Sequence, residues 1–470
     1  MSHELHPDPS TTASPTPTAP PPLALRERPG RWLDGYRPED PDFWESTGRP
    51  IARTNLKWSI FAEFLGFAVW QLWAITVIYL PQAGFDFSTS QIFWLLSIPS
   101  LVGATLRIPY TFMVGRFGGR NWTIVSALLL LVPTVGLALA VSDPGTPFGL
   151  MLLLAATAGF GGGNFASSMA NITYFYPVRE KGYALGLNAA GGNVGTAVAQ
   201  LLVPIAVTVL AAGALDLPLA GWLWVPFILF AAWGARKYMH NLSHAKGDVA
   251  GSLATVKEPH FWIMSFLYVG TFGSFIGFSS VFPKLIADTF PEFSSFSVGA
   301  AALSLAFMGP LVGSVSRPWG GRLADRFGGA PMTVAVFAVM ALLALAVVIT
   351  LPLASFWLFL GLFLLLFTAA GMGNGSTYRM IPSIYRVLGL RRQVDVAVST
   401  ERKASAALGL IGAVGAYGGF MIPQALNLSN TTTGAYSSAF YGFVAFYVVA
   451  LAVTWFCYLR KGTEMGDSHI

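Results

Sequence analysis

The sequence predicts an all-α integral membrane protein with twelve transmembrane helices, arranged as two homologous halves of six. Three observations support this class. Apolar runs of around 20 residues recur along the chain, and each is long enough to cross a bilayer as a helix. The 470 residues are 54% hydrophobic and only 11% charged, whereas a soluble domain carries about 25% charged residues. Finally, several motifs recur at one constant spacing along the chain.

The apolar runs place the expected helices, and a polar linker divides them into two sets. The expected ranges are about 57–80, 92–115, 121–141, 147–176, 181–211, 220–239, 260–285, 297–323, 331–352, 355–385, 403–427 and 435–460. We expect a tail over residues 1–50, a first half over 51–239, the linker over 240–258, a second half over 259–460 and a short tail over 461–470. The start of the first tail is rich in Pro, Thr and Ser, so we expect that tail to be partly disordered.

The distribution of charge predicts the topology. Most of the 28 Lys and Arg residues lie at the chain ends or in alternate connections between apolar runs, and the remaining connections carry acids such as Asp86, Asp143 and Asp216. By the positive-inside rule, both termini are cytoplasmic and the protein is a multi-pass protein of the cell (inner or plasma) membrane. The net charge of +6 then reflects topology and predicts no nucleic-acid partner. With Cys457 as the single cysteine, a disulfide framework or a thiol metal site is excluded, and no cofactor is expected.

The repeated motifs each contain a charged residue or glycines inside an apolar run. Val102–Pro109, with Arg107 inside it, recurs 210 residues later as Val312–Pro318, with Arg317 inside it. The same spacing takes Arg116–Gly119 to Arg326–Gly329. The chain is therefore built twice, with one buried arginine in each copy. Twelve helices in two homologous halves with cytoplasmic ends indicate the major facilitator architecture, whose substrate site lies between the halves near the membrane midplane.

The two arginines favour a small anion as substrate. An arginine at the centre of a bilayer costs about 2.5–3.5 kcal/mol on insertion scales, so its presence needs a reason. The only acid that we place inside a helix is Glu63, near the cytoplasmic end of the first helix, where we expect it to pair with Lys57 or Arg53. Two guanidinium groups without a counter-ion would bind an exogenous anion, and their planar fork suits a planar oxyanion. The alternative is a snorkelling or internally paired arginine.

Two glycine-rich runs mark the predicted fourth and tenth helices. The residues concerned are Gly161, Gly162, Gly163 and Asn164 in the first half, and Gly371, Gly373, Asn374 and Gly375 in the second. Small residues let helices approach closely, either as static packing or as a seam along which helices slide, and the two interpretations are compatible. A third repeat has Asn188 and Asn193 where the second half has Ile411 and Ala416. Asparagines inside helices usually join helices, but this asymmetry suggests that at least one contacts substrate.

The glycine runs resemble the signatures of a known family. Gly159–Pro177 is similar to the first nitrate signature of the nitrate/nitrite porters, and Gly371–Thr377 is similar to the second. The resemblance extends from Arg37 to about Arg460 and is greatest to bacterial NarK-type nitrate/nitrite exchangers. It implies that Arg107 and Arg317 bind substrate, that aromatic rings sandwich the anion, that an asparagine contacts it and that a tyrosine donates a hydrogen bond. The matching residues are Phe165, Phe272, Asn193 and Tyr268.

These observations predict a transporter and not an enzyme. We expect an alternating-access exchanger of nitrate and nitrite, active in nitrate assimilation as a monomer in the lipid bilayer. Exchange would be obligatory, because an empty site would leave the two arginines repelling each other. The alternatives are proton-coupled nitrate symport, for which Glu63 is the helix-embedded candidate, an anion channel or a nitrate sensor. Glu63 and Arg379 depart from the family pattern, and we expect Arg379 to be a snorkelling residue or part of a gate.

Overall fold

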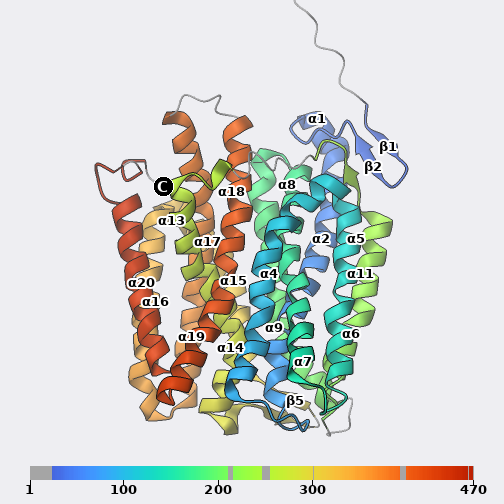
Figure 1. The fold of residues 1–470 in the computed structure, drawn as a ribbon. Coiled ribbons are helices and arrows are strands. Elements are labelled where there is room, and N and C mark those ends of the chain that lie inside the picture. Colours follow the sequence, from blue (N-terminus) through green and yellow to red (C-terminus); the bar gives the residue numbers. More distant parts are fainter. Residues whose placement is uncertain are drawn as a thin grey trace, which may run out of the picture.

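The computed structural model describes residues 24–209, 215–245, 254–299, 301–391, 398–463, 465–468 and 470. Long helices stand side by side and run between two ends of the molecule (Figure 1). The helices of the first half are α2 (Arg49–Trp70), α3 (Leu72–Thr76), α4 (Thr89–Phe117), α5 (Gly119–Leu129), α6 (Leu131–Ala140), α7 (Phe148–Thr157), α8 (Gly159–Phe175), α9 (Val178–Val209), α10 (Leu219–Trp222) and α11 (Val225–Tyr238). Those of the second half are α13 (Pro259–Tyr268), α14 (Ser274–Thr289), α15 (Met308–Phe327), α16 (Gly329–Thr350), α17 (Phe356–Arg391), α18 (Val398–Ala416), α19 (Gly418–Thr433) and α20 (Ser437–Tyr458).

The all-α membrane class is confirmed. Among the described residues, ten helices are long and apolar enough to cross a membrane, or eleven if the bent pair Pro41–Trp70 and Leu72–Tyr79 forms one span. Of the twelve predicted segments, only the one that contains α15 lies outside this set. Within its 20 residues, α15 carries the charged residues Arg317, Arg322, Asp325 and Arg326, so it is too polar to be recognised as a membrane span from composition alone. It nevertheless packs against α16 and α17. The protein is a multi-pass membrane protein.

The predicted helix over 297–323 is wrong in its first third. Phe296–Val298 (β4) and Ala301–Leu303 (β5) form an antiparallel hairpin, and α15 begins only at Met308. The alanine-rich sequence resembles a helix, but Gly299 adopts a φ of +63°, which interrupts a right-handed helix. The backbone N–H of Ala302 donates instead to the Thr208 hydroxyl of α9, at 3.0 Å.

Several predicted spans are broken near their centres. The first is interrupted at Gln71, between α2 and α3, and the eleventh at Tyr417, between α18 and α19. In the seventh, a π-helical turn, Val269–Gly273, separates α13 from α14. Such turns occur in helices mostly as local bulges, frequently at functional sites.

A small sheet joins the N-terminal segment to the region after α11. Arg26–Arg28 (β1) pairs antiparallel with Trp32–Asp34 (β2), which pairs in parallel with Asn241–Leu242 (β3). Burial, together with the charges of Arg31 and Arg120, lowers the pKa of His240 beside this sheet to about 4, so its ring is neutral near pH 7. Residues 1–23, where we expect disorder, and residues 246–253 of the expected linker lie outside the described residues.

The two halves are hydrogen-bonded to each other at one end of the bundle. This is the end that carries β4 and β5, opposite to the end with β1, β2 and the C-terminus (Figure 1). The pairs recorded between α2–α11 and the second half are Ser90–Asn427, Phe93–Gln424, Ser97–Gln424, Thr105–Tyr417, Arg107–Gly412, Gln71–Ser280, Gln200–Ser279 and Thr208–Ala302. Of these recorded pairs, Arg107–Gly412 lies nearest the end with the termini.

Candidate functional site

Two arginines and one glutamate lie buried in the centre of the bundle. Among the described residues, Arg107 and Arg317 are the buried basic side chains other than histidine, and Glu63 is the one buried acidic side chain. Each arginine lies ten residues before the last residue of its helix, α4 or α15. The repeat in the sequence thus places the two arginines at equivalent depths in the two halves.

Arg107 is fully buried and is fixed by both halves. Its Nε donates to the carbonyl of Gly162 at 3.0 Å, and its Nη1 donates to the carbonyl of Gly412 at 2.9 Å. Phe165 and Phe272 lie over its guanidinium, with their ring centroids 4.5 and 4.8 Å from Cζ. The remaining nitrogen, Nη2, is buried without a hydrogen-bond partner among the described residues.

The predicted aromatic pair therefore surrounds an arginine. The rings of Phe165 and Phe272 stack with their centroids 6.1 Å apart, one ring from each half. The family resemblance implies that these rings sandwich the anion. The structure places them on the guanidinium of Arg107, where their faces attract the cation and help to exclude water from it.

A line of aromatic rings leads from Arg107 to Arg317. Phe272 stacks on Tyr268 with 5.4 Å between centroids, Tyr268 contacts Tyr378 at 6.2 Å, and Tyr378 lies 5.3 Å from Cζ of Arg317. The two guanidinium groups interact electrostatically with each other and with Tyr268. The two arginines and both aromatic residues predicted from the second half thus belong to one site.

Several buried polar groups of the predicted site and signature residues have no partner within the described residues. They are Nη1 of Arg317, the hydroxyl of Tyr268, both amide atoms of Asn193 and of Asn164, and the amide oxygen of Asn374. Buried polar groups are normally hydrogen-bonded, and an unpaired one costs about 1–3 kcal/mol. Four of these residues, Arg317, Tyr268, Asn193 and Asn164, have an unpaired donor atom, so the set is suited to a small anion with several acceptor oxygens.

The signature glycines bring the helices of each half into close contact. A Cβ on Gly162 would lie 2.6 Å from the Trp70 ring and 2.9 Å from the Cα of Gly103. In the second half, a Cβ on Gly375 would lie 2.2 Å from the backbone oxygen of Arg317. Gly161, Gly163, Gly371 and Gly373 are equally crowded. The packing interpretation therefore holds for both signatures, and each glycine run is in contact with the helix that carries its arginine.

The expectation that Glu63 lies near the cytoplasmic end of the first helix and pairs with Lys57 or Arg53 is wrong. Because α2 begins at Arg49 and not near residue 57, Glu63 lies well inside the helix and is fully buried. Arg53 and Lys57 are exposed on the same helix, and the described ion pairs do not join either of them to Glu63. Its Oε2 accepts instead from Nδ2 of Asn188 at 2.7 Å.

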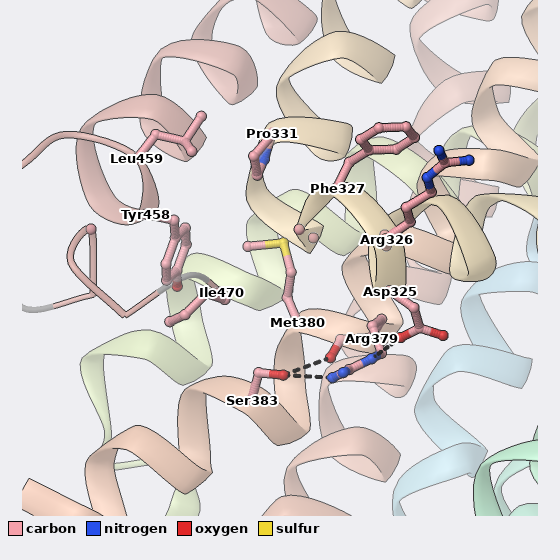
Figure 2. A pocket seen from close by; sticks show the side chains of 14 residues that line it. Asp325, Arg326, Phe327, Pro331, Arg379, Met380, Ser383, Tyr458, Leu459 and Ile470 are labelled. Atoms are coloured by element: carbon pink, nitrogen blue, oxygen red, sulfur yellow. Dashed lines mark hydrogen bonds and ion pairs between the residues drawn. The ribbon is translucent and has the colours of Figure 1, made fainter.

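Arg379 lies in the part of α17 nearer its last residue, Arg391, beside a cavity of about 300 Å³. Figure 2 shows its guanidinium paired with Asp325 and bonded to the hydroxyl of Ser383. The side chain is 43% exposed. It therefore belongs to the surface of the second half, as a snorkelling residue would.

Comparison with known proteins agrees with this architecture and names the family. Residues 60–423 match the Major Facilitator Superfamily. The chain is 39% identical over 452 residues to the nitrate/nitrite transporter NarU of Escherichia coli (strain K12), covering 91% of this chain and 96% of NarU. The chain belongs to the nitrate/nitrite porter family. A second relative is the probable nitrate/nitrite antiporter NarK2 of Thermus thermophilus, at 35% identity over 94% of this chain and 99% of that protein.

Solved major facilitator structures share the fold of this nitrate/nitrite porter. A bacterial homologue of the human lysosomal transporter Spinster, crystallised in an inward-facing and occupied conformation, aligns with a TM-score of 0.62. The alignment covers 87% of this chain and 97% of the homologue at 18% identity. The nucleoside transporter NupG aligns with a TM-score of 0.58, at 13% identity over 85% of this chain and 98% of NupG. The matched proteins are transporters and not enzymes.

Four parts of this site were not predicted from the sequence. Tyr378, the Trp70 ring 5.3 Å from the Arg107 guanidinium, and the carbonyls of Gly162 and Gly412 all contact an arginine. Tyr378 follows the second signature directly in sequence, and this proximity was the available signal for it. The sequence contains no signal for the two carbonyls, because a backbone acceptor is present at every position.

Proposed function

We propose that this porter carries nitrate and nitrite, and that it exchanges one for the other by alternating access. The observation that supports the proposal is the pair of buried arginines, each with a guanidinium nitrogen that has no partner among the described residues. An oxyanion placed between them would supply the missing acceptors, and hydrogen bonds between charged groups are about twice as strong as neutral ones. Relatives at 39% and 35% identity are a nitrate/nitrite transporter and a probable nitrate/nitrite antiporter.

The anion would be bound by groups from both halves. Arg107 and Asn193 come from the first half, and Arg317 and Tyr268 come from the second. Phe165 and Phe272 would hold Arg107 in place and keep water from the anion, while the signature residues Gly161–Asn164 and Gly371–Gly375 maintain the close helix packing. Because both halves contact one anion, its binding favours closure of the halves around it, which alternating access requires.

Exchange follows from the charge of the site. When the halves close without an anion, two guanidinium groups approach each other in a medium of low dielectric constant, which is unfavourable. The anion-free protein would therefore reorient more slowly than the anion-bound protein. Nitrate uptake should be fast when nitrite is available on the other side to support the return step.

The protein would lie in the cell membrane, or the inner membrane of a cell with two, with both termini in the cytoplasm. The basic connections are at the end of the bundle that carries the termini, as the positive-inside rule requires. The halves are hydrogen-bonded at the opposite end, so the conformation described corresponds to access from the cytoplasm. We propose a monomer, since each chain contains both arginines of the site.

Reconstitution tests this function. Purified protein in liposomes loaded with nitrite should take up external nitrate and release nitrite in equal amounts, at a rate well above that of protein-free liposomes. Uptake no faster than in protein-free liposomes would refute the proposal. Single-channel conductance in planar bilayers, far above the turnover of a carrier, would show an anion channel instead.

A further inference from the structure

The carboxyl group of Glu63 has an environment that the exchange function does not explain. It is fully buried near the middle of the bundle. Its Oε2 accepts one hydrogen bond, from Asn188, whose Nδ2 also donates to the Ser168 hydroxyl at 2.7 Å. Its Oε1 is buried with no hydrogen-bond partner among the described residues. The neighbours of the carboxyl group, Asn188 and Ser168, are both neutral, so an ionised Glu63 would be a buried charge without an ion-pair partner in the described part of the chain, and binding a proton would remove that charge.

The packing around Glu63 links it to the anion site. A Cβ at position 192 would lie 2.4 Å from Oε1 of Glu63, so only glycine leaves room for the carboxyl group there. The next residue on α9 is Asn193, whose buried amide has no hydrogen-bond partner among the described residues and which we assign to the anion site. A change in the charge or contacts of Glu63 therefore acts on the helix that carries Asn193.

Cations at the anion site are the charged groups that interact with Glu63. Arg107 on α4 and Arg317 on α15 both interact electrostatically with its carboxyl group. The phenol of Tyr378 on α17 is a titratable group that also interacts electrostatically with Glu63. From α8 and α9, the groups that contact it are the uncharged Ser168 and Asn188. The remaining charged residues on the helical segments packed around α2 lie nearer than Glu63 to the end of the bundle with the termini; they are Glu45, Arg49, Arg53, Lys57, Arg116, Arg120, Arg179, Glu180, Lys181, Arg236 and Lys237.

We propose that Glu63 is a proton-binding site coupled to the anion site, so that the protein can also carry nitrate together with a proton. This inference rests on the proposed transport of nitrate. Without an anion, the ionised carboxylate partly neutralises the two arginines. A bound nitrate adds negative charge beside the carboxylate, so nitrate binding and protonation of Glu63 favour each other, and the coupling is reciprocal.

The charge balance explains how two transport modes can coexist. With nitrate bound and Glu63 protonated, the site carries the same net charge as the anion-free site with Glu63 ionised. The proton comes from the solution on the side where nitrate enters and leaves with nitrate on the other side, and no bond other than the carboxyl O–H forms or breaks. During exchange Glu63 keeps its proton, whereas net uptake requires that the proton is released before the anion-free protein returns.

Proton uptake on nitrate binding is the direct test. Wild-type protein in weakly buffered detergent solution, with a pH-indicator dye, should take up close to one proton per nitrate bound at a pH where free Glu63 is ionised. Where free Glu63 is ionised, nitrate affinity should fall by up to tenfold for each unit by which the pH is raised, which is the limit for linkage to one proton. Nitrate binding without proton uptake between pH 5 and 8 overturns the inference and leaves the proposed function intact. Absence of nitrate binding would instead refute the proposed function.

The matched transport test uses Glu63→Gln, with Glu292→Gln as control. Glu292 is an exposed glutamate at the end of the bundle near β4. We expect Glu63→Gln to lose proton-driven net uptake into nitrite-free liposomes and nitrate-induced proton uptake, while nitrate–nitrite exchange continues. The control should retain all three. Proton-driven net uptake at the wild-type rate in Glu63→Gln overturns the inference. Loss of nitrate binding in that variant also overturns it, because Glu63 would then belong to the anion site itself.

Discussion

The two repeated arginines lie at equivalent depths but in unequal surroundings. Arg107 is fully buried, donates to two backbone carbonyls and is covered by Phe165, Phe272 and Trp70. Arg317 is 6% exposed and has one ring over its guanidinium, that of Tyr378. Duplication placed a cation in each half, and the surrounding contacts then gave the two cations different roles. Arg107 is pre-organised, and Arg317 is the more adaptable partner.

Replacing each arginine by lysine should have the largest effect and should separate these roles. Lysine keeps the charge and loses the planar fork that matches an oxyanion. We expect Arg107→Lys and Arg317→Lys each to lower kcat/KM for nitrate by on the order of 100-fold, equivalent to two strong hydrogen bonds. Only Arg107→Lys should also lower Tm, because it leaves the Gly162 and Gly412 carbonyls without their donor.

The measurements are nitrate uptake in proteoliposomes and thermal unfolding in detergent. Normal nitrate affinity in both variants would contradict recognition by the guanidinium fork. Equal losses of Tm in both variants would show that the surroundings of the two arginines stabilise the fold equally.

Replacing Gly375 should have the second largest effect on nitrate exchange. A Cβ there would lie 2.2 Å from the backbone oxygen of Arg317 and 2.7 Å from the nitrogen of Gly321, and backbone atoms cannot move aside cheaply. Gly375→Ala should therefore displace α15 with Arg317 and reduce nitrate exchange at least tenfold. Gly361→Ala is the matched control on the same helix, since nothing lies within 4 Å of its Cβ. Wild-type exchange by Gly375→Ala would show that close packing of α15 on α17 is dispensable.

The sequence was sufficient to predict most of the fold because the membrane imposes simple rules. Apolar length and alternating charge identified the bundle, and the 210-residue repeat identified Arg107 and Arg317. The hairpin before α15 was missed because its alanines favour a helix, and only Gly299 marked the turn. Glu63 was misplaced because the polar residues Arg49–Lys57 concealed the start of α2. The Gly162 and Gly412 carbonyls depend on tertiary packing, which periodicity cannot reveal.

Tyrosine hydroxyls near Arg317 should have a moderate and unequal effect. The Tyr268 hydroxyl is buried without a hydrogen-bond partner in the described residues, so Tyr268→Phe removes a donor available to the anion. We expect nitrate affinity to fall about tenfold, since a hydrogen bond to a charged group contributes about 1.5–3 kcal/mol. Tyr378→Phe keeps the ring over Arg317 and should change affinity by less than about threefold. Titration calorimetry measures the nitrate affinity of both variants. A larger loss of affinity in Tyr378→Phe than in Tyr268→Phe would show that Tyr378, and not Tyr268, donates to the anion.

The smallest effect is expected where the two halves differ at the surface. The second half has the Asp325–Arg379 ion pair beside the cavity in Figure 2, whereas the equivalent positions of the first half, 210 residues earlier, are Gly115 and Met169. Both side chains are largely exposed, at 59% and 43%, and such pairs contribute about 0–1 kcal/mol. Asp325→Asn should therefore change Tm by less than about 2 °C and leave nitrate exchange unchanged. A loss of exchange at constant Tm would instead make this pair part of a gate, and the asymmetry between the halves would then extend from the anion site to the surface.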